Sequence, residues 1–449
     1  MFDLDAPFFL ALARSLVQAA LAGGIALALG WPAGVAAGVW NFPGRRALIL
    51  VTALPLLLPS FLVAIGLSLL WRDLGGLGAS VWTFACSGVP LVFFATLAAT
   101  RTVTHGQADA ARLAGGERLL FCLALRGSRP VAALAALLAA VMTLADVGPG
   151  QIFGWHSAAS ELLISFAARY DRALATHQAL TIALVAAVCA WPLVWRLAPT
   201  LTTSLLSRDT TKIVRRSRPM ASFALAALEL GIVVLPLAGL LRPLLGHPLP
   251  LARAWSEVAR TWADTALYAA LAAALAVAAG FFAAAMARRS PQRHRLAVAA
   301  ALGLFALPPV LTALWLIPLS SCFTVGLALA LRCLPVAVLF GLRAFGAMPR
   351  SWSEAAAVHR VPRAIFALRV AAPWLARWAA PAALLAALLA TAEIGVVLLL
   401  HPPGHGTLPL AVFTVMANAP EALVAMLCLL YVGLVVVLGG IVAVSRPSA

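Results

Sequence analysis

Long apolar stretches recur along the whole chain, separated by short polar segments. Eleven of them have the length of a membrane span: 8–30, 47–71, 79–100, 130–146, 176–195, 222–241, 262–287, 296–317, 322–342, 378–400 and 422–444. A helix of about 20 apolar residues crosses the roughly 30 Å hydrocarbon core of a bilayer. The pattern therefore predicts an all-α polytopic membrane protein with eleven transmembrane helices, or twelve.

Composition and charge agree with this class of protein. Mean hydropathy is +1.00 and only 10% of residues are charged, whereas about a quarter are charged in soluble domains. With alternating spans and the N-terminus outside, most of the 32 Lys and Arg residues fall in inside segments, as the positive-inside rule requires. We therefore expect a bacterial inner-membrane protein with a periplasmic N-terminus and a cytoplasmic C-terminus. The net charge of +17 is spread over separate loops, so no nucleic-acid partner is expected.

Two further features bear on processing and redox chemistry. The N-terminus lacks the positive region and cleavage site of a signal peptide, so the first span is expected to be retained. The six cysteines show no Cys-x-x-Cys spacing. We interpret them as small buried apolar residues, with no disulfide framework or metal site.

The chain divides into two similar halves around a polar segment. Residues 200–219 form a predicted cytoplasmic linker between a first transmembrane domain, 1–199, and a second, 220–449. LADVG at 144–148 is matched by TAEIG at 391–395, and Val-Pro and Leu-Pro pairs recur at a similar offset. Five spans match in order, and span 222–241 is unmatched. An odd span between the halves makes the repeats parallel, with a passage on their shared axis.

Two basic, Ala-rich segments interrupt the apolar pattern at matching places. They are DAARLAGGERLLFCLALRGSRP at 109–130 and EAAAVHRVPRAIFALRVAAP at 354–373. Ala, Leu and Arg are strong helix formers, and a short surface helix can enter a partner's groove. The alternative interpretation is a basic loop that only follows the positive-inside rule. Two copies at matching positions favour docking helices.

These segments resemble the cytoplasmic loop of permease subunits of binding-protein-dependent ABC importers. The family pattern is an acid followed by Ala-Ala, a Gly six residues after the acid, and a distal Pro. The residues that fit it are Asp109, Ala110, Ala111 and Gly115 in the first copy, and Glu354, Ala355, Ala356 and Pro373 in the second. The sequence departs from the pattern at Ser128, in place of Pro, and at Arg360, in place of Gly.

The resemblance implies a mechanism and partners. In that family the loops are coupling helices that dock on two copies of an ATPase subunit, and Arg363 is expected on this docking surface. A periplasmic substrate-binding protein delivers the solute. Residues 393–420 are similar to the iron(III)- and thiamine-type branch, whose permeases are fused, which implies ferric iron or another small solute such as thiamine. The branch has six spans in each half, and the first half here lacks the leading one.

The sequence gives no sign of catalysis in this chain. A nucleotide-binding P-loop needs Gly-Lys-Ser/Thr, and the single lysine, Lys212, stands between Thr211 and Ile213. We therefore expect no enzyme activity and no cofactor here, with ATP and Mg on the partner ATPase. An ion-coupled secondary transporter is the alternative function, because it would also have repeats and buried acids.

Ionisable residues at membrane depth are candidates for the pathway. Asp146 and Glu393 occupy equivalent places, each two residues before a glycine. They either line the outer mouth of a pathway and attract a cationic solute, or cap the loop that follows. Glu229 lies within the unmatched span and is expected to pair with an arginine of another helix. Arg332 lies at depth and needs an acid to neutralise it.

Two histidine-containing loops at the predicted periplasmic side could be mistaken for metal sites. His401 and His405 lie in a Pro/Gly-rich loop, and Trp155 and His156 lie in its counterpart. Two histidines without neighbouring acids or cysteines in the sequence make a weak metal site. We expect a loop that contacts a binding protein or packs as a re-entrant turn.

Overall fold

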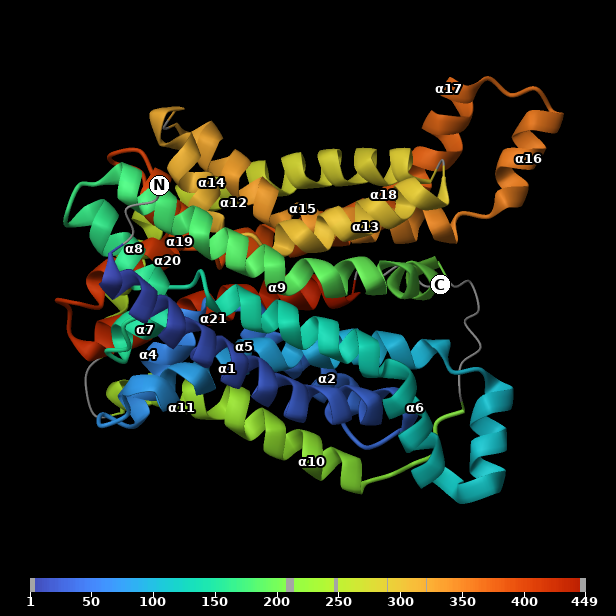
Figure 1. The fold of residues 1–449 in the computed structure, drawn as a ribbon, viewed down its shortest axis with the longest axis horizontal. Coiled ribbons are helices and arrows are strands. Elements are labelled where there is room, and N and C mark those ends of the chain that lie inside the picture. The colour runs from blue at the N-terminus through green and yellow to red at the C-terminus, as the bar shows by residue number, and fades with distance from the viewer. Residues whose placement is uncertain (1–4, 207–213, 246–248, 289, 320, 445–449) are drawn as a thin grey trace.

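The computed structural model describes residues 5–206, 214–245, 249–288, 290–319 and 321–444. Within these ranges the chain is helical, and its long helices run side by side in one bundle (Figure 1). The helices up to the predicted linker are α1 Ala6–Val39, α2 Arg45–Thr52, α3 Leu54–Leu57, α4 Ser60–Leu70, α5 Gly76–Ala99, α6 His105–Thr143, α7 Gly148–Ile152, α8 Ala158–Ala167 and α9 Arg172–Leu206. A short 3-10 turn, η1 Thr100–Thr102, follows α5.

The remaining helices repeat a similar mixture of long and short elements. They are α10 Met220–Glu229, α11 Leu235–Leu241, α12 Leu251–Ala287, α13 Pro291–Ala306, α14 Pro309–Leu316, α15 Cys322–Ala347, α16 Arg350–Val358, α17 Arg363–Phe366, α18 Ala372–Thr391, α19 Gly395–Leu400, α20 Leu408–Val415 and α21 Glu421–Val444. Single 3-10 or π-helical turns lie at Leu230–Val234, Arg242–Leu244, Ile317–Leu319 and Ala367–Ala371.

The prediction of an all-α polytopic protein is confirmed. In the described part of the chain, nine helices are long and apolar enough to cross a membrane. Two helix pairs are also long and apolar enough when taken together, which gives up to eleven spans if each pair is one span; they are bent by 101° between Leu57 and Ser60 and by 81° between Ala306 and Pro309. Both breaks fall at a Leu-Pro pair whose leucine is extended, because a proline disfavours the helical conformation of the residue before it. Hydropathy alone predicted these two spans as continuous.

The predicted span 130–146 is also longer in the structure. It forms the second part of α6, which turns sharply at Gly115 and Gly116 and then runs on to Thr143. The polar residues before position 130 hid this extension from the hydropathy pattern. The predicted bounds 378–400 are wrong, because the span runs over Arg363–Thr391 and residues 395–400 form the separate short helix α19. This span and the span over 222–241 each contain one π-helical turn, at 367–371 and 230–234. A proline, Pro236 or Pro373, follows each turn, and the wider turn accommodates the missing donor and the bulk of the ring.

The two ends of the bundle differ. Helices α16 and α17 and the first turns of α6 project beyond the long helices at one end, hereafter the α16 end (Figure 1). The short helices α7, α8, α19 and α20 lie at the other end, hereafter the α8 end, where α1 also begins. Helix α21 ends at the α16 end. The start of α1 and the end of α21 therefore lie at opposite ends of the bundle.

The unmatched span, α10 and α11, packs on the first half of the chain. Gly66 of α4 and Gly239 of α11 are in direct backbone contact, since a Cβ atom at position 239 would lie 1.7 Å from the Gly66 carbonyl oxygen. The buried residues Ile232 and Val233 belong to one apolar cluster with α1, α4 and α5. Thus the span that follows the linker in sequence lies against helices that precede it.

The structure describes both ends of the predicted linker. Helix α9 runs on to Leu206, so the first part of 200–219 is helical, and Lys212 lies outside the described residues. Ser217 then forms an isolated parallel bridge with Asn41, between α1 and α2. The Asn41 N–H donates to the Arg216 carbonyl (3.0 Å) and the Arg218 N–H to the Asn41 carbonyl (2.8 Å). The chain is therefore tied to the first half immediately before α10.

Candidate functional site

A cavity of about 170 Å³ lies between the two halves of the chain. It is lined by the break between α3 and α4, by α5 and the end of α6, and on the other side by α14, α15 and the break between α18 and α19. At about 30 Å³ for each water of liquid volume, it is large enough for a small solute. Its walls are mostly apolar, and its polar lining residues are Ser60, Ser87, Thr143, Asp146, Arg332 and Glu393.

Asp146 lines this cavity just after the end of α6. The Ser60 hydroxyl donates to its Oδ2 (2.5 Å), and the backbone N–H of Gly148 donates to its Oδ1 (3.0 Å). The hydrogen bond from Gly148 is the loop cap expected under one of the two interpretations of Asp146; the other interpretation was that Asp146 lines the outer mouth of a pathway. The two interpretations are compatible in the structure, because the carboxylate that caps α7 also lines the cavity.

Glu393 lines the same cavity from the second half. The Gly395 N–H donates to its Oε1 (3.2 Å), which repeats the cap made by Asp146. Its Oε2 lies 3.6 Å from Nε of Arg332, and the two side chains are 18% and 13% exposed. This ion pair lies where water is scarce, so its electrostatic attraction is weakly screened.

Arg332 is held by two further contacts with Phe305. Its Nη1 donates to the Phe305 carbonyl oxygen (2.8 Å), and its guanidinium carbon lies 5.0 Å from the centre of the Phe305 ring. Phe305 lies near the end of α13, just before the bent break to α14. The guanidinium therefore satisfies one carbonyl group at that break, that of Phe305, and also lies beside the Glu393 carboxylate.

The structure brings together three of the four ionisable residues that sequence analysis placed at membrane depth. Glu229 lies elsewhere and, contrary to the prediction, forms no ion pair with an arginine among the described residues: it accepts a hydrogen bond from the Thr52 hydroxyl (2.5 Å). Sequence analysis missed Ser60 and Ser87 as cavity residues. Ser60 follows the Leu58–Pro59 break directly, and a polar residue at a proline break of an apolar span is a signal that could have identified it.

The first predicted coupling segment forms a short helix followed by a sharp turn. Thr104 and Gln107 form a capping box at the start of α6, and the turn has Gly115 extended and Gly116 at φ 68°. Asp109, Ala110 and Ala111 lie on the short helix before this turn, with the Asp109 side chain 66% exposed. The glycine pair thus separates a surface helix at the α16 end from the long span that follows.

A buried ion pair anchors this turn. Nε of Arg112 lies 2.7 Å from Oε1 of Glu117, and their side chains are 8% and 6% exposed. The Trp40 indole donates to Oε2 of the same glutamate (3.2 Å), and Arg216 lies 3.7 Å from Oε1. Arg112 also donates to the Val214 carbonyl (2.6 Å). Glu117 therefore joins the predicted coupling segment to the end of α1 and to the predicted linker, a role that sequence analysis missed.

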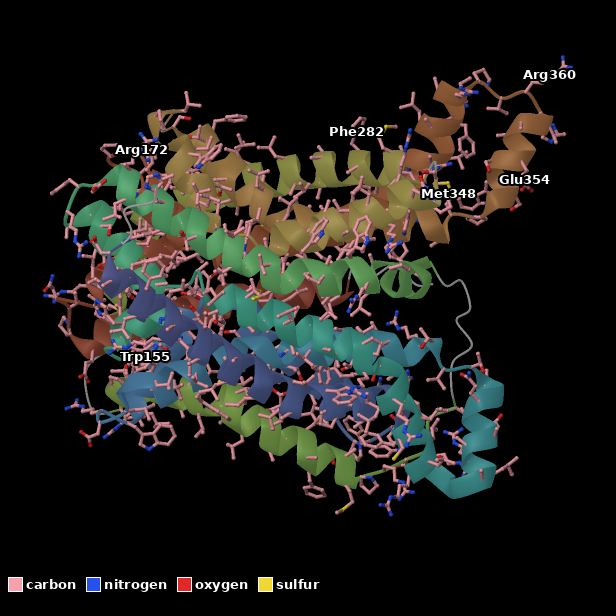
Figure 2. The ribbon with its side chains drawn as sticks, viewed as in Figure 1. Trp155, Arg172, Phe282, Met348, Glu354 and Arg360 are labelled. Carbon is pink, nitrogen blue, oxygen red and sulfur yellow. The ribbon has the colours of Figure 1, made fainter. Side chains whose placement is uncertain are left out.

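The second predicted coupling segment projects further from the bundle. Glu354, Ala355 and Ala356 lie on α16, and Figure 2 shows Glu354 and Arg360 at the tip of this projection, far from Trp155. Arg360 has φ 51°, a left-handed conformation that costs a side chain free energy and that glycine adopts freely. The residue that departs from the family pattern thus occupies a backbone conformation that favours glycine.

The remaining predicted residues of these segments have different environments. Arg363 is the exposed first residue of α17, and Pro373 is the second residue of α18, inside the continuous stretch 363–391. Ser128, which replaces the distal proline of the first copy, is buried in α6. It accepts a hydrogen bond from the Trp31 indole (2.9 Å) and donates to the Ala124 carbonyl (2.8 Å).

The histidine loops at the α8 end pack through side-chain contacts. Nδ1 of His405 lies 3.0 Å from Oδ1 of Asp264 in α12, and the Gly406 N–H donates to Oδ2 (3.1 Å). Nδ1 of His401 lies 2.9 Å from the Val397 carbonyl. Sequence analysis missed Asp264 because it is remote in sequence. The described residues contain no group of three or more His, Cys, Asp or Glu arranged to hold a metal.

The counterpart loop carries Trp155 and His156. The guanidinium of Arg14 lies 5.7 Å from the Trp155 ring centre, and Nε2 of His156 lies 3.6 Å from Oε2 of Glu161. Contacts to α1 and α8 therefore fix this loop against the bundle.

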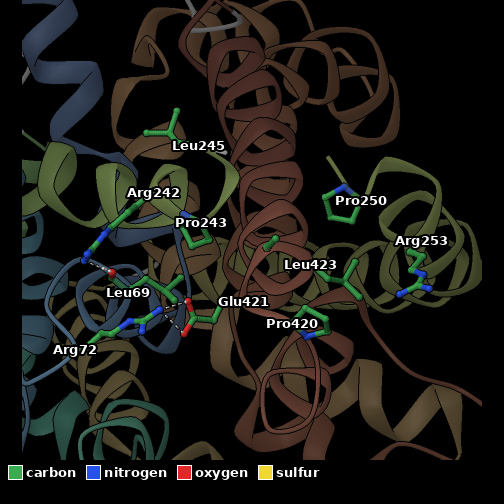
Figure 3. Close-up of a pocket in the computed structure, with 11 residues that line it drawn as sticks. Leu69, Arg72, Arg242, Pro243, Leu245, Pro250, Arg253, Pro420, Glu421 and Leu423 are labelled. Atoms are coloured by element: carbon green, nitrogen blue, oxygen red, sulfur yellow. Dashed lines mark hydrogen bonds and ion pairs between the residues drawn. The ribbon is translucent and has the colours of Figure 1, made fainter. Parts of the chain in front are cut away.

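An open groove of about 590 Å³ lies between the halves (Figure 3). Arg72 and Glu421 form an ion pair across it (3.0 Å), and Arg242 donates to the carbonyls of Leu69 (3.1 Å) and Leu70 (2.6 Å). Both acidic and basic groups of the ion pair are largely exposed, so it contributes little to stability.

No family model, curated protein or solved structure matches the chain.

Proposed function

We propose that this chain is the permease of an ABC importer, in which a small solute crosses the membrane through the cavity between two repeated halves. The observation that carries the proposal is the pair Asp146 and Glu393. Each carboxylate accepts a hydrogen bond from the glycine N–H two residues later, and both line one cavity from opposite halves. Such matched geometry is expected where two copies of one unit face each other across a pathway.

The order of the helices supports a duplication. Two series of helices correspond in order. The first series is α1, the bent pair formed by α2–α3 and α4, then α5, α6, α7, α8 and α9. The second series is α12, the bent pair formed by α13 and α14, then α15, α16–α18, α19, α20 and α21. Both bent pairs break at Leu-Pro, and α5 and α15 carry prolines at matching positions, Pro90 and Pro335. We infer that α10 and α11 are the leading span of the second half.

The two projecting segments support coupling to separate ATPase subunits. Residues 105–116 and 350–362 occupy corresponding places in the two series and project at the same end of the bundle (Figure 1). We propose that this end is cytoplasmic, that the α8 end is periplasmic, and that one ATPase copy docks on each segment. ATP and Mg bind the ATPase, which drives alternating access because ATP favours one conformation of the assembly.

The charges of the cavity support a cationic solute. Two carboxylates and one guanidinium leave one net negative charge when all three are ionised. An apolar wall strengthens the attraction of that charge for a cation. Ferric iron and thiamine, the cargoes that the resemblance implies, are both cationic. A periplasmic binding protein would deliver the solute at the α8 end.

The first experiment isolates the chain from its native membranes in mild detergent and identifies the proteins that co-elute by mass spectrometry. We expect a P-loop ATPase at two copies for each chain. The variant Arg363→Glu with Gly115→Pro should lose the ATPase while remaining inserted. If the chain elutes alone, also after crosslinking in intact membranes, the ABC assignment is wrong.

An ion-coupled secondary transporter is the second candidate, and the carboxylates in the cavity favour it. The two functions differ in energy source. After reconstitution into vesicles without an ATPase, a secondary transporter would accumulate solute when a proton or sodium gradient is imposed. The proposed permease would not.

A further inference from the structure

The two carboxylates of the cavity differ in how their charges are balanced. Glu393 lies 3.6 Å from Nε of Arg332. Within the described ranges Asp146 forms no ion pair, and it accepts hydrogen bonds from two neutral groups, the Ser60 hydroxyl and the Gly148 N–H. The charge of Arg332 also acts on Asp146, but one guanidinium cannot balance two carboxylates. The cavity therefore retains one negative charge on the Asp146 side when all three groups are ionised.

The position that supplies the guanidinium in the second half holds a serine in the first half. Arg332 stands three residues before Pro335 of α15, and Ser87 stands three residues before Pro90 of α5. Under the duplication proposed above these two positions are equivalent, and both line the cavity. The first half therefore lacks the side chain that would neutralise its own carboxylate.

The Ser87 hydroxyl is shielded from water and has no hydrogen-bond partner among the described residues. A buried hydroxyl without a partner costs free energy and requires a physical explanation. Gly88, the next residue, packs on α6, since a Cβ atom there would lie 3.2 Å from Cβ of Ala139. Helix α6 ends at Thr143, three residues before Asp146. The hydroxyl and the carboxylate therefore belong to the wall of the cavity that α5 and the end of α6 form.

The chemistry of this wall suits a nitrogen cation. An ammonium, amidinium or guanidinium group donates charge-assisted hydrogen bonds to a carboxylate, and a further N–H can donate to the lone pairs of a serine hydroxyl. Phe61 and Phe84 line the cavity from the first half, and aromatic rings attract organic cations. The second half already holds such a group, because the Arg332 guanidinium lies beside the Glu393 carboxylate and the Phe305 ring.

We propose that an organic nitrogen cation, with an ammonium, amidinium or guanidinium group, binds in the cavity against Asp146 and Ser87. Its charged group takes the role that the Arg332 guanidinium has in the second half. This inference rests on the proposed transport function and duplication, and it narrows the substrate class from cations in general to organic nitrogen cations.

The test measures binding by the purified full-length chain in detergent, with no ATPase and no uptake step. The probes are guanidinium chloride and methylammonium chloride at low millimolar concentrations, far below those that denature proteins. Sodium chloride and magnesium chloride at equal ionic strength are the comparisons. A ligand that binds only the folded state raises the unfolding temperature. We expect guanidinium or methylammonium to stabilise the wild type more than sodium or magnesium does.

Ser87→Arg supplies the first half with the guanidinium that the second half has. We expect this variant to unfold at or above the wild-type temperature and to lose its response to both probes. Ser87→Ala should need about fivefold more probe for the same stabilisation, the effect of one hydrogen bond, and Asp146→Asn about tenfold more or above. These two variants keep the test decisive if Ser87→Arg folds poorly. Ser256→Arg adds an arginine at an exposed position of α12 and should respond as the wild type does.

The proposal is overturned if neither nitrogen cation stabilises the wild type beyond sodium, or if magnesium stabilises it more than both do. It is also overturned if Asp146→Asn, or a folded Ser87→Arg, responds as the wild type does. Failure of the transport assignment gives a different result. A chain that binds guanidinium through Asp146 but elutes without an ATPase refutes the ABC assignment and supports this site. A chain that elutes with the ATPase but binds neither probe refutes only this site.

Discussion

Gly66 and Gly239 bring the backbones of α4 and α11 into contact, so that a single methyl group at position 239 would lie 1.7 Å from the Gly66 carbonyl oxygen. Small residues allow this close approach of membrane helices, where packing replaces the hydrophobic effect as the source of association. The contact joins α11, which follows residues 200–219 in the chain, to α4, which precedes them.

Gly239→Ala should therefore destabilise the protein, because one of the two helices must move. We expect a cost of about 1–3 kcal/mol, typical of overpacking, seen as a lower unfolding temperature in detergent. Gly433→Ala in α21 is the matched control, since a Cβ atom there meets nothing within 4 Å. Equal unfolding temperatures for the two variants would show that α4 and α11 are not packed as described.

Glu117→Gln should loosen the first predicted coupling segment, residues 105–116. The change leaves Arg112 buried without its carboxylate, while the short helix 105–114 loses its tie to α1. We expect faster amide hydrogen exchange at 105–116 and a cost of about 1–3 kcal/mol, the penalty for an uncompensated buried polar group. Asp109→Asn, at a 66% exposed side chain, should leave exchange unchanged. If both variants exchange alike, Glu117 is not the anchor.

Arg360→Gly should be tolerated or should stabilise the second predicted coupling segment, residues 350–362. The φ of 51° at this position costs an ordinary residue about 1 kcal/mol, which glycine avoids. Arg360→Val should be worse than both, because β-branched residues are least suited to this region. Thermal unfolding and limited proteolysis of the exposed segment would rank the three proteins. A valine variant that equals the glycine variant would contradict the assigned backbone conformation.

Arg332→Met should destabilise the cavity by removing the only guanidinium beside Glu393 among its lining residues. Losing one partner of a buried pair costs roughly 3–5 kcal/mol, and we expect about 2 kcal/mol here because the side chains are 13% and 18% exposed. Arg332→Met combined with Glu393→Gln should recover part of that loss. A double-mutant cycle with additive costs would show that the two residues do not interact.

Asp146→Asn with Glu393→Gln tests the pathway directly. If the carboxylates attract a cationic solute, uptake should fall by at least tenfold while the protein remains inserted and co-elutes with its ATPase. The amide side chains can still accept the glycine N–H hydrogen bonds, so the loop caps are preserved. Nearly normal uptake would mean that both carboxylates serve only as caps.

The sequence predicted the spans because twenty-residue apolar runs carry a strong local signal. It also placed Asp146 and Glu393 at equivalent positions. It did not predict the bends at Leu58–Pro59 and Leu307–Pro308, since hydropathy averages over a break of two residues. A proline within an apolar run could have indicated them.

The side-chain pairings could not be read from the sequence, because they join residues that are distant along the chain. Arg332 and Glu229 seemed suitable partners by charge and depth alone. In the structure the helix rotations turn Arg332 toward Glu393 and Glu229 toward Thr52. Asp264 and His405 likewise meet only through the packing of α12 against the loop before α20.

The contact between α11 and α4 has a consequence for how the gene can be divided. If the polypeptide is expressed as two separate fragments, 1–206 and 214–449, the second fragment carries both the segment around Ser217 and helix α11, which contact the first fragment. The two fragments should then associate without a covalent connection, through the bridge between Ser217 and Asn41 and the contact between Gly239 and Gly66. The covalent join then acts mainly to keep the two pieces in equal number.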